Sequence, residues 1–111
     1  MPNFDKEINI LGTTWKVITS DSGKNPILEE ADGYCDGTLK ECVIKNIIPT
    51  HDTAGNLEEH RKRITRHEII HAFLFECGLS SESWAANEEI VDWIARQFPK
   101  LLQVFSELGV L

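Results

Sequence analysis

Residues 56–78 read NLEEHRKRITRHEIIHAFLFECG, and this stretch decides how the second half of the chain folds. Asn56 is a good N-cap residue, and Glu59 three positions later completes a capping-box pattern. Gly78 stands where the left-handed conformation that ends many helices is needed. The stretch therefore predicts a helix from about Leu57 to Cys77.

Proline and glycine also divide the rest of the C-terminal half. A second helix is expected from about Ser83 to Phe98, because Pro99 breaks a helix and can open the next one as its first residue. The third helix is then expected to end at Gly109. It carries an apolar stripe that consists of Leu101, Val104, Phe105 and Leu108.

The first half of the chain has the alternating apolar residues and the turns that are typical of strands. Residues 6–19 predict a hairpin that turns at Leu11-Gly12, and residues 20–32 predict a loop. A second hairpin is expected to turn at Asp36-Gly37 and to leave as a strand from Leu39 to Ile47.

Strands therefore come first and helices after, which indicates the α+β class. We expect a small antiparallel sheet of two hairpins, packed on a set of about three helices. At 111 residues the chain suits one domain, with a sheet half at 1–50 and a helical half at 56–111 that contains the chemistry described below.

The charge balance argues against several classes of function. Eleven basic against eighteen acidic residues give a net charge of −7, whereas binding to nucleic acids or to anionic membranes needs a basic surface. No apolar run approaches the ~20 residues needed to cross a bilayer. The N-terminus also lacks the pattern of a secretory signal. We therefore expect a cytoplasmic protein with no nucleic-acid or membrane partner.

Three cysteines, Cys35, Cys42 and Cys77, occur without any Cys-x-x-Cys pair, so a thiolate zinc site has no support. An odd number of cysteines and no secretory signal predict reduced thiols rather than a disulfide framework. Cys35 and Cys42 are spaced to face each other across the second hairpin, which leaves room for their oxidation.

The most informative element is His67-Glu68-Ile69-Ile70-His71, in the middle of the first predicted helix. Histidines at i and i+4 lie on one face of a helix, so their imidazoles can bind one ion at ~2.0–2.1 Å. Glu68 projects about 100° round the helix, which suits a general base that acts on a water activated by the metal. His60 lies ~10.5 Å of helix rise before His67 and is interpreted as a surface histidine.

A catalytic zinc site usually has three protein ligands, and the second predicted helix offers the third. If the two helices run antiparallel across a short loop, residue pairs whose numbers have the same sum lie level with each other. The pair His71 and Glu88 has the same sum as the pair His67 and Asp92. Glu88 can then bind the ion while Asp92 accepts a hydrogen bond from the other ring nitrogen of His67. Glu89 remains an alternative third ligand, about 100° round the helix from Glu88.

These motifs carry a family resemblance. His67-Glu68-x-x-His71 followed by Asn87-Glu88-x-x-Val91-Asp92 resembles the gluzincin signature, in which a glutamate on a following helix completes the zinc site. The thermolysin-like pattern is Asn-Glu-x-x-Ser-Asp, and this chain has valine at the serine position. The chain as a whole is similar to small phage and prophage proteins of Gram-positive bacteria, near the ImmA/IrrE-type metallopeptidases. The wider resemblance rests on residues 11–13, 66–78 and 84–99.

The resemblance implies a single minimal zincin-like domain that binds one Zn²⁺ per chain and hydrolyses peptide bonds. A polypeptide is the implied substrate, and a phage or prophage regulatory protein is a reasonable class of target. The implied site consists of the zinc ligands His67, His71 and Glu88, the catalytic residue Glu68, and Asp92 as a supporting partner of His67.

Peptidases of this kind usually add a Tyr, His or Arg that stabilises the tetrahedral oxyanion. After Asp92 the chain has neither Tyr nor His, and Arg96 is its one arginine. Tyr34, His51 and Arg96 are therefore the candidates for this role. In small zincins an edge strand above the active-site helix receives an extended peptide, and residues 41–47 are the candidate edge, with an ordinary core strand as the alternative.

The alternative function is a non-enzymatic zinc-binding adaptor or regulatory module, in which the same metal clamps two helices of a small domain. A large loss of stability on chelation, without any peptidase activity, favours this alternative. A metal-free protein that stays folded favours the enzyme.

Overall fold

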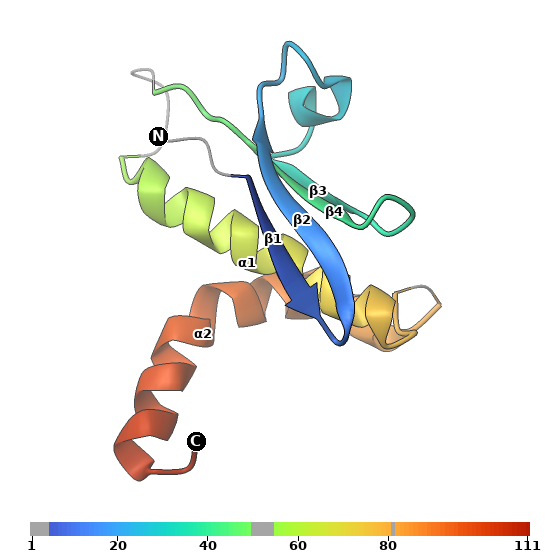
Figure 1. The fold of residues 1–111 in the computed structure, drawn as a ribbon. Helices are drawn as coiled ribbons and strands as arrows, with labels where there is room; N and C mark the ends of the chain where they lie inside the picture. Colours follow the sequence, from blue (N-terminus) through green and yellow to red (C-terminus); the bar gives the residue numbers. More distant parts are fainter. Residues whose placement is uncertain (1–4, 50–54, 81) are drawn as a thin grey trace.

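The computed structural model describes residues 5–49, 55–80 and 82–111. Within these residues a four-stranded sheet precedes two long helices, which confirms the α+β class but gives one helix fewer than predicted (Figure 1). No helix in this part of the chain is long and apolar enough to span a membrane. The strands are β1 (Asp5–Ile10), β2 (Thr13–Ser20), β3 (Gly33–Asp36) and β4 (Glu41–Lys45).

Both predicted hairpins form, but the second turns over residues 37–40 rather than at Asp36-Gly37, and its outgoing strand is shorter than the predicted 39–47. The hairpins join into a mixed sheet rather than an antiparallel one. β1 and β2 pair antiparallel, as do β3 and β4, whereas β2 and β4 run parallel in the order β1-β2-β4-β3. Alternation along a strand determines which side chains face the core, but it does not determine how two hairpins join. The segment between β2 and β3, which contains the 3-10 helix η1 (Pro26–Glu29), crosses over so that β4 lies beside β2.

The prediction that residues 41–47 form an edge strand is wrong. β4 is an interior strand, because β2 pairs with it on one side and β3 on the other. The edge strand beside it is β3, which also contacts the first long helix. The crossover between the hairpins therefore decides which strand borders the helix that carries the two histidines.

Helix α1 (Leu57–Glu76) begins and ends within one residue of the prediction. The Asn56 side chain accepts a hydrogen bond from the backbone N–H of Glu59 at 3.0 Å, and Gly78 has a left-handed φ of 83°. The helix packs across one face of the sheet (Figure 1). The core cluster combines Ala72 of the helix with five residues of the sheet, Ile10, Trp15, Val17, Cys42 and Ile44.

Glu76 joins the end of α1 to the first hairpin. Its carboxylate accepts hydrogen bonds from Trp15 Nε1 at 2.7 Å and from Thr13 Oγ1 at 3.1 Å, and Lys40 Nζ lies 3.3 Å away. The bond from Trp15 is the main reason that the pKa of Glu76 lies below its usual value. These contacts fix the position of the helix along the sheet, and with it the position of His71 five residues earlier.

Helix α2 (Glu88–Leu108) replaces the two separate helices that were predicted at residues 83–98 and from Pro99. The residues at which the second helix was predicted to start instead form a 3-10 helix, η2 (Trp84–Ala86). The Asn87 side chain caps α2 by accepting hydrogen bonds from the backbone N–H groups of Glu89 and Ile90. Pro99 lies inside α2, which bends in its middle and then runs away from the sheet (Figure 1).

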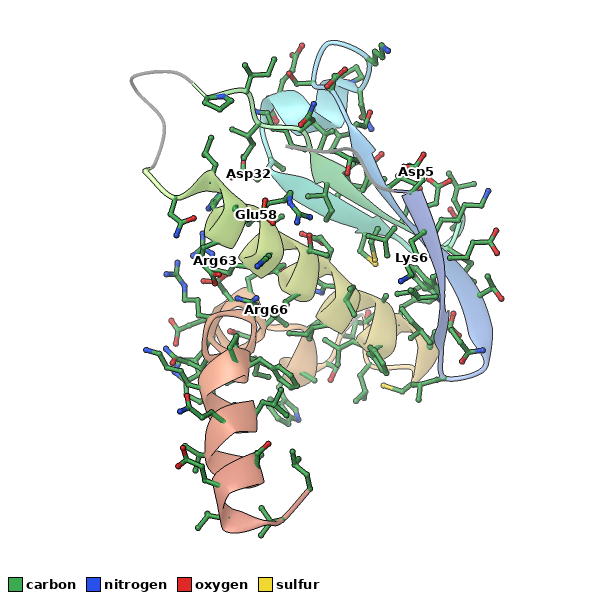
Figure 2. The ribbon with its side chains drawn as sticks, turned by 60° about the vertical axis from the view of Figure 1, so that its left-hand side comes forward. Asp5, Lys6, Asp32, Glu58, Arg63 and Arg66 are labelled. Carbon is green, nitrogen blue, oxygen red and sulfur yellow. The ribbon has the colours of Figure 1, made fainter. Side chains whose placement is uncertain are left out.

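Arg66 replaces the hydrogen bond that α2 loses at Pro99. Proline has no N–H, so the carbonyl of Ala95, four residues earlier, loses its helical partner. Arg66 Nε, on α1, donates a hydrogen bond to that carbonyl at 2.6 Å, and Figure 2 shows Arg66 between the two helices. A side chain 29 residues away in sequence thus satisfies the freed carbonyl, and a local pattern cannot reveal this contact.

Arg66→Met is expected to destabilise the fold by about 1–2 kcal/mol, because the carbonyl of the buried Ala95 loses its donor. In a Pro99→Ala background the same change is expected to cost less, since the substituted residue restores an N–H that can donate to Ala95. Urea unfolding of the wild type, the two single variants and the double variant gives the coupling energy between Arg66 and Pro99. The exposed Lys62→Met on the same helix is the control. Equal costs in both backgrounds would contradict this role of Arg66.

Candidate metal centre

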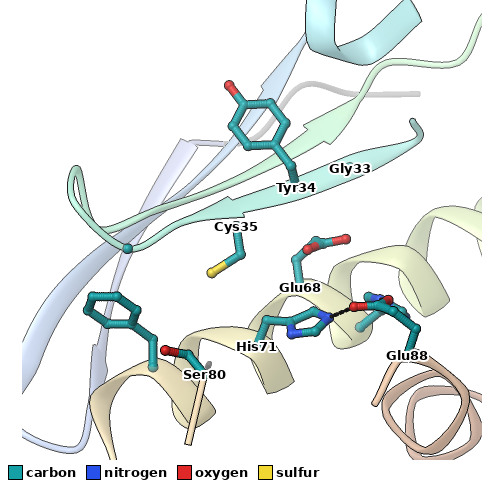
Figure 3. Close-up of a pocket in the computed structure, with 10 residues that line it drawn as sticks. Gly33, Tyr34, Cys35, Glu68, His71, Ser80 and Glu88 are labelled. Atoms are coloured by element: carbon teal, nitrogen blue, oxygen red, sulfur yellow. Dashed lines mark hydrogen bonds and ion pairs between the residues drawn. The ribbon is translucent and has the colours of Figure 1, made fainter. Parts of the chain in front are cut away.

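His67 and His71 of α1 converge on Glu88, the first residue of α2. His67 Nε2 lies 2.9 Å from Glu88 Oε2, and His71 Nε2 lies 2.8 Å from Glu88 Oε1 (Figure 3). One nitrogen from each histidine and one oxygen of Glu88 lie within 4.8 Å of one another. Two imidazoles and one carboxylate are a donor set found at catalytic zinc sites, so the three side chains fit a zinc ion.

The two imidazole rings are held close together by their spacing on α1. Their centroids are 5.0 Å apart, and both side chains are largely buried. Burial lowers the pKa of His71, while the neighbouring Glu88 acts in the opposite direction. The neutral imidazole is the form of histidine that binds metal ions.

The packing of α2 determines which of two adjacent glutamates faces the histidines. Val91, three residues after Glu88, is buried where α2 packs on α1, so Glu88 shares the inward face of the helix. Glu89 instead lines a separate hollow with Ile90 and Trp93. Among the residues that the structure describes, the candidate ligand cluster contains Glu88 and not Glu89.

Asp92, one turn after Glu88, approaches the other nitrogen of His67. Asp92 Oδ1 lies 3.4 Å from His67 Nδ1, yet that buried nitrogen has no hydrogen-bond partner. Arg96 Nε instead donates to Asp92 Oδ2 at 2.7 Å, and this bond is the main cause of the lowered pKa of Asp92. The structure thus brings Asp92 to ion-pair distance of His67 without the predicted hydrogen bond.

Glu68 points from α1 toward β3 and is 7% exposed (Figure 3). Burial raises the pKa of its carboxyl to about 7, with His67 opposing the rise and Glu88 adding to it. Gly33 of β3 makes this arrangement possible, because a Cβ there would lie 3.3 Å from Glu68 Cγ and 2.9 Å from Ile64 Cγ2. Glu68 thus differs from the glutamates at the start of the same helix, which are exposed to solvent.

A cleft of about 450 Å³ opens between α1 and the edge strand β3 (Figure 3). Both histidines, Glu68 and Glu88 line it from the helices. Sequence reasoning did not place the other lining residues at the site. Gly33, Cys35 and Gly37 come from β3 and the turn after it, and the strand order that brings β3 over α1 is a long-range feature. Phe75, near the end of α1, and Ser80, after it, complete the lining.

Of the three candidates for oxyanion stabilisation, the two that the structure describes, Tyr34 and Arg96, do not turn toward the histidines. Tyr34 contributes to the lining of the cleft, but its ring points away from His71 in Figure 3, and its hydroxyl accepts a hydrogen bond from Asn25 Nδ2 at 2.7 Å. Arg96 is paired with Asp92. His51 lies outside the described residues.

His60 is not the solvated surface histidine that the sequence predicted. Its side chain is only 23% exposed, and His60 Nε2 lies 2.8 Å from Asp32 Oδ2. Arg63 Nη2 lies 3.1 Å from the other ring nitrogen. The residue therefore links α1 to the segment before β3, well away from the candidate ligands.

No protein-family model, curated protein sequence or solved structure matches the chain.

Proposed function

We propose that this protein is a zinc-dependent metallopeptidase with a minimal zincin-like site of the gluzincin type. The observation that carries the proposal is the convergence of His67, His71 and Glu88 in one cleft with the buried carboxyl group of Glu68. Paired histidines on one helix, a carboxylate from the next helix and an additional glutamate beside them form a set that serves metal-assisted hydrolysis.

The proposed roles follow from where each side chain lies. His67, His71 and Glu88 would hold the Zn²⁺, which when bound supplies Lewis acidity toward a peptide carbonyl and toward water. Glu68 accepts the proton of the attacking water and passes it to the leaving amine. The position of Glu68 supports both roles, because its side chain lines the cleft next to the proposed ligand His67 and faces β3.

The edge strand β3 suggests how a substrate binds. An extended polypeptide can add to a sheet edge by β-augmentation, and an edge strand that borders the cleft would place one peptide bond beside Glu68 and His71. We therefore propose an extended or unfolded polypeptide as the substrate. The resemblance to phage and prophage proteins favours a phage or prophage regulatory protein as the target.

The test is incubation of the zinc-loaded full chain with a denatured, carboxymethylated protein, followed by mass spectrometry of the products. New peptides that form with zinc and disappear with a chelator would support a peptidase. A protein shown to hold one zinc ion that cleaves no unfolded polypeptide would overturn the proposal.

One observation favours a second candidate function, a non-enzymatic adaptor or regulatory module. Glu88 contacts both histidines across the α1–α2 junction, so a metal there can clamp the two helices. Within the described residues, neither Tyr34 nor Arg96 turns toward the histidines as an oxyanion donor would. Thermal unfolding with zinc and with a chelator separates the two functions. A large fall in Tm on chelation, together with no peptidase activity, would identify the clamp.

Asp92→Ala is expected to weaken zinc binding by about 10–100-fold, because ligand histidines depend on a partner at their other ring nitrogen. Asp92 is the carboxylate nearest to that nitrogen of His67, at 3.4 Å. Arg96→Ala is the matched control, since it removes the competing donor to Asp92 and is expected to keep or raise the affinity. Competition with a colorimetric zinc indicator measures both, and wild-type affinity in Asp92→Ala would contradict the role.

A further inference from the structure

Cys35 of β3 and Cys42 of β4 stand directly opposite each other in the sheet. Hydrogen-bonded and non-hydrogen-bonded pairs alternate along an antiparallel ladder. The backbone N–H of Lys45 donates to Asp32 O at 2.8 Å in the same register, so Cys35 and Cys42 form a non-hydrogen-bonded pair. Such pairs have Cα atoms about 4.5 Å apart and the closer side chains. A disulfide requires a Cα separation of about 4.4–6.8 Å, and the separation typical of a non-hydrogen-bonded pair lies within that range.

The two thiols differ in their access to solvent. Cys42 is fully buried in the core, and its Sγ lies 3.5 Å from the carbonyl oxygen of Glu68. Cys35 is half-buried and lines the cleft, with its sulfur between β3 and α1 (Figure 3). A hydrogen bond between the two thiols lowers the pKa of Cys35 and raises that of Cys42. An oxidant that enters the cleft therefore meets Cys35 first, with Cys42 directly behind it.

We propose that Cys35 and Cys42 are a redox modification site, which closes to a reversible cross-strand disulfide when hydrogen peroxide enters the cleft. Cys35 Sγ first attacks the peroxide, the O–O bond breaks, and a sulfenic acid and one water form. Cys42 Sγ then attacks Cys35 Sγ, the S–O bond breaks, and the oxygen leaves as a second water with the thiol proton. Two thiols lose two electrons and two protons, and one peroxide is reduced to two waters.

The disulfide changes the floor of the cleft without using any candidate metal ligand. It bonds the edge strand β3 covalently to the interior strand β4, and it draws Cys42 Sγ away from the Glu68 carbonyl. Closing the loop of residues 35–42 also restricts the unfolded chain, which raises Tm. The inference therefore goes beyond the proposed peptidase and stands whether or not the chain binds zinc.

Peptide mapping of the full chain tests the inference directly, because trypsin cleaves after Lys40, between the two cysteines. The folded protein is treated with hydrogen peroxide, its remaining thiols are alkylated, and it is digested. The expected product is peptide 25–40 linked to peptide 41–45, lighter by two hydrogens than the separate peptides and released by dithiothreitol. The oxidised protein is also expected to melt at a higher temperature than the reduced protein.

Variants of the three cysteines complete the design. Cys35→Ser and Cys42→Ala are each expected to abolish the linked peptides and the rise in Tm, with circular dichroism to verify folding. Cys77→Ser is the matched control that keeps both, since the exposed Cys77 belongs to another part of the fold. Peroxide treatment that yields only sulfinic acid at Cys35, leaves both thiols free, or links either thiol to Cys77 would overturn the proposal.

Discussion

Glu68→Gln is expected to lower the rate of peptide hydrolysis by about 10²–10⁴-fold, the range attributed to a general base, while zinc content stays unchanged. Glutamine matches the buried side chain in size but cannot take a proton from water. Glu68 lies outside the candidate ligand cluster, so the substitution leaves the donors for the metal in place. The measurement is kcat/KM for a fluorogenic peptide, with zinc content determined on the same samples.

Glu89→Gln is the matched control for this prediction. Glu89 is exposed and lines a different hollow, so the same chemical change there is expected to leave kcat/KM at the wild-type value. Hydrolysis at the wild-type rate in zinc-loaded Glu68→Gln would exclude Glu68 as the general base. A metal-content measurement on each variant distinguishes that result from an assay compromised by loss of zinc.

The meeting of His67, His71 and Glu88 could be anticipated because it depends on short-range geometry. The caps at Asn56 and Gly78 define one helix, and residues four apart in any helix share a face. Placing Glu88 beside them needed only one further assumption, that a short loop returns the chain antiparallel. That assumption holds, because successive contacts pair His71 with Glu88, His67 with Asp92 and Arg66 with Ala95, so α2 runs back along α1.

The features that the sequence did not reveal all depend on contacts between distant segments. Local rules predict that Pro99 interrupts a helix, whereas α2 continues through it with the freed carbonyl of Ala95 accepting a hydrogen bond from the distant Arg66. The crossover that makes β2 and β4 parallel is likewise decided by the whole sheet. It makes β3 the edge strand and so brings Gly33 and Cys35 into the cleft, where no spacing in the sequence would place them.

Glu88→Ala is expected to lower zinc affinity by more than about 100-fold, so that dialysed protein loses its metal, while Glu89→Ala retains about one zinc per chain. We expect more than about 100-fold because loss of a residue that only hydrogen-bonds to a metal ligand already lowers metal affinity by about 10–100-fold, and loss of a ligand itself has a larger effect. His71→Ala is expected to match Glu88→Ala, since each removes one of the three donors that converge. Metal content by atomic emission, with titration of the metal-free proteins, measures these effects.

The comparison of Glu88 with Glu89 is informative because the two residues are neighbours with the same charge and both are exposed. General electrostatic attraction of a cation would fall equally in the two alanine variants, whereas ligation distinguishes them by the direction of the side chain. Only Glu88 contacts both histidines, through one carboxylate oxygen each. Zinc lost from Glu89→Ala but kept by Glu88→Ala would reassign the third ligand. Absence of zinc from wild-type protein supplied with excess metal would remove the premise on which both candidate functions rest.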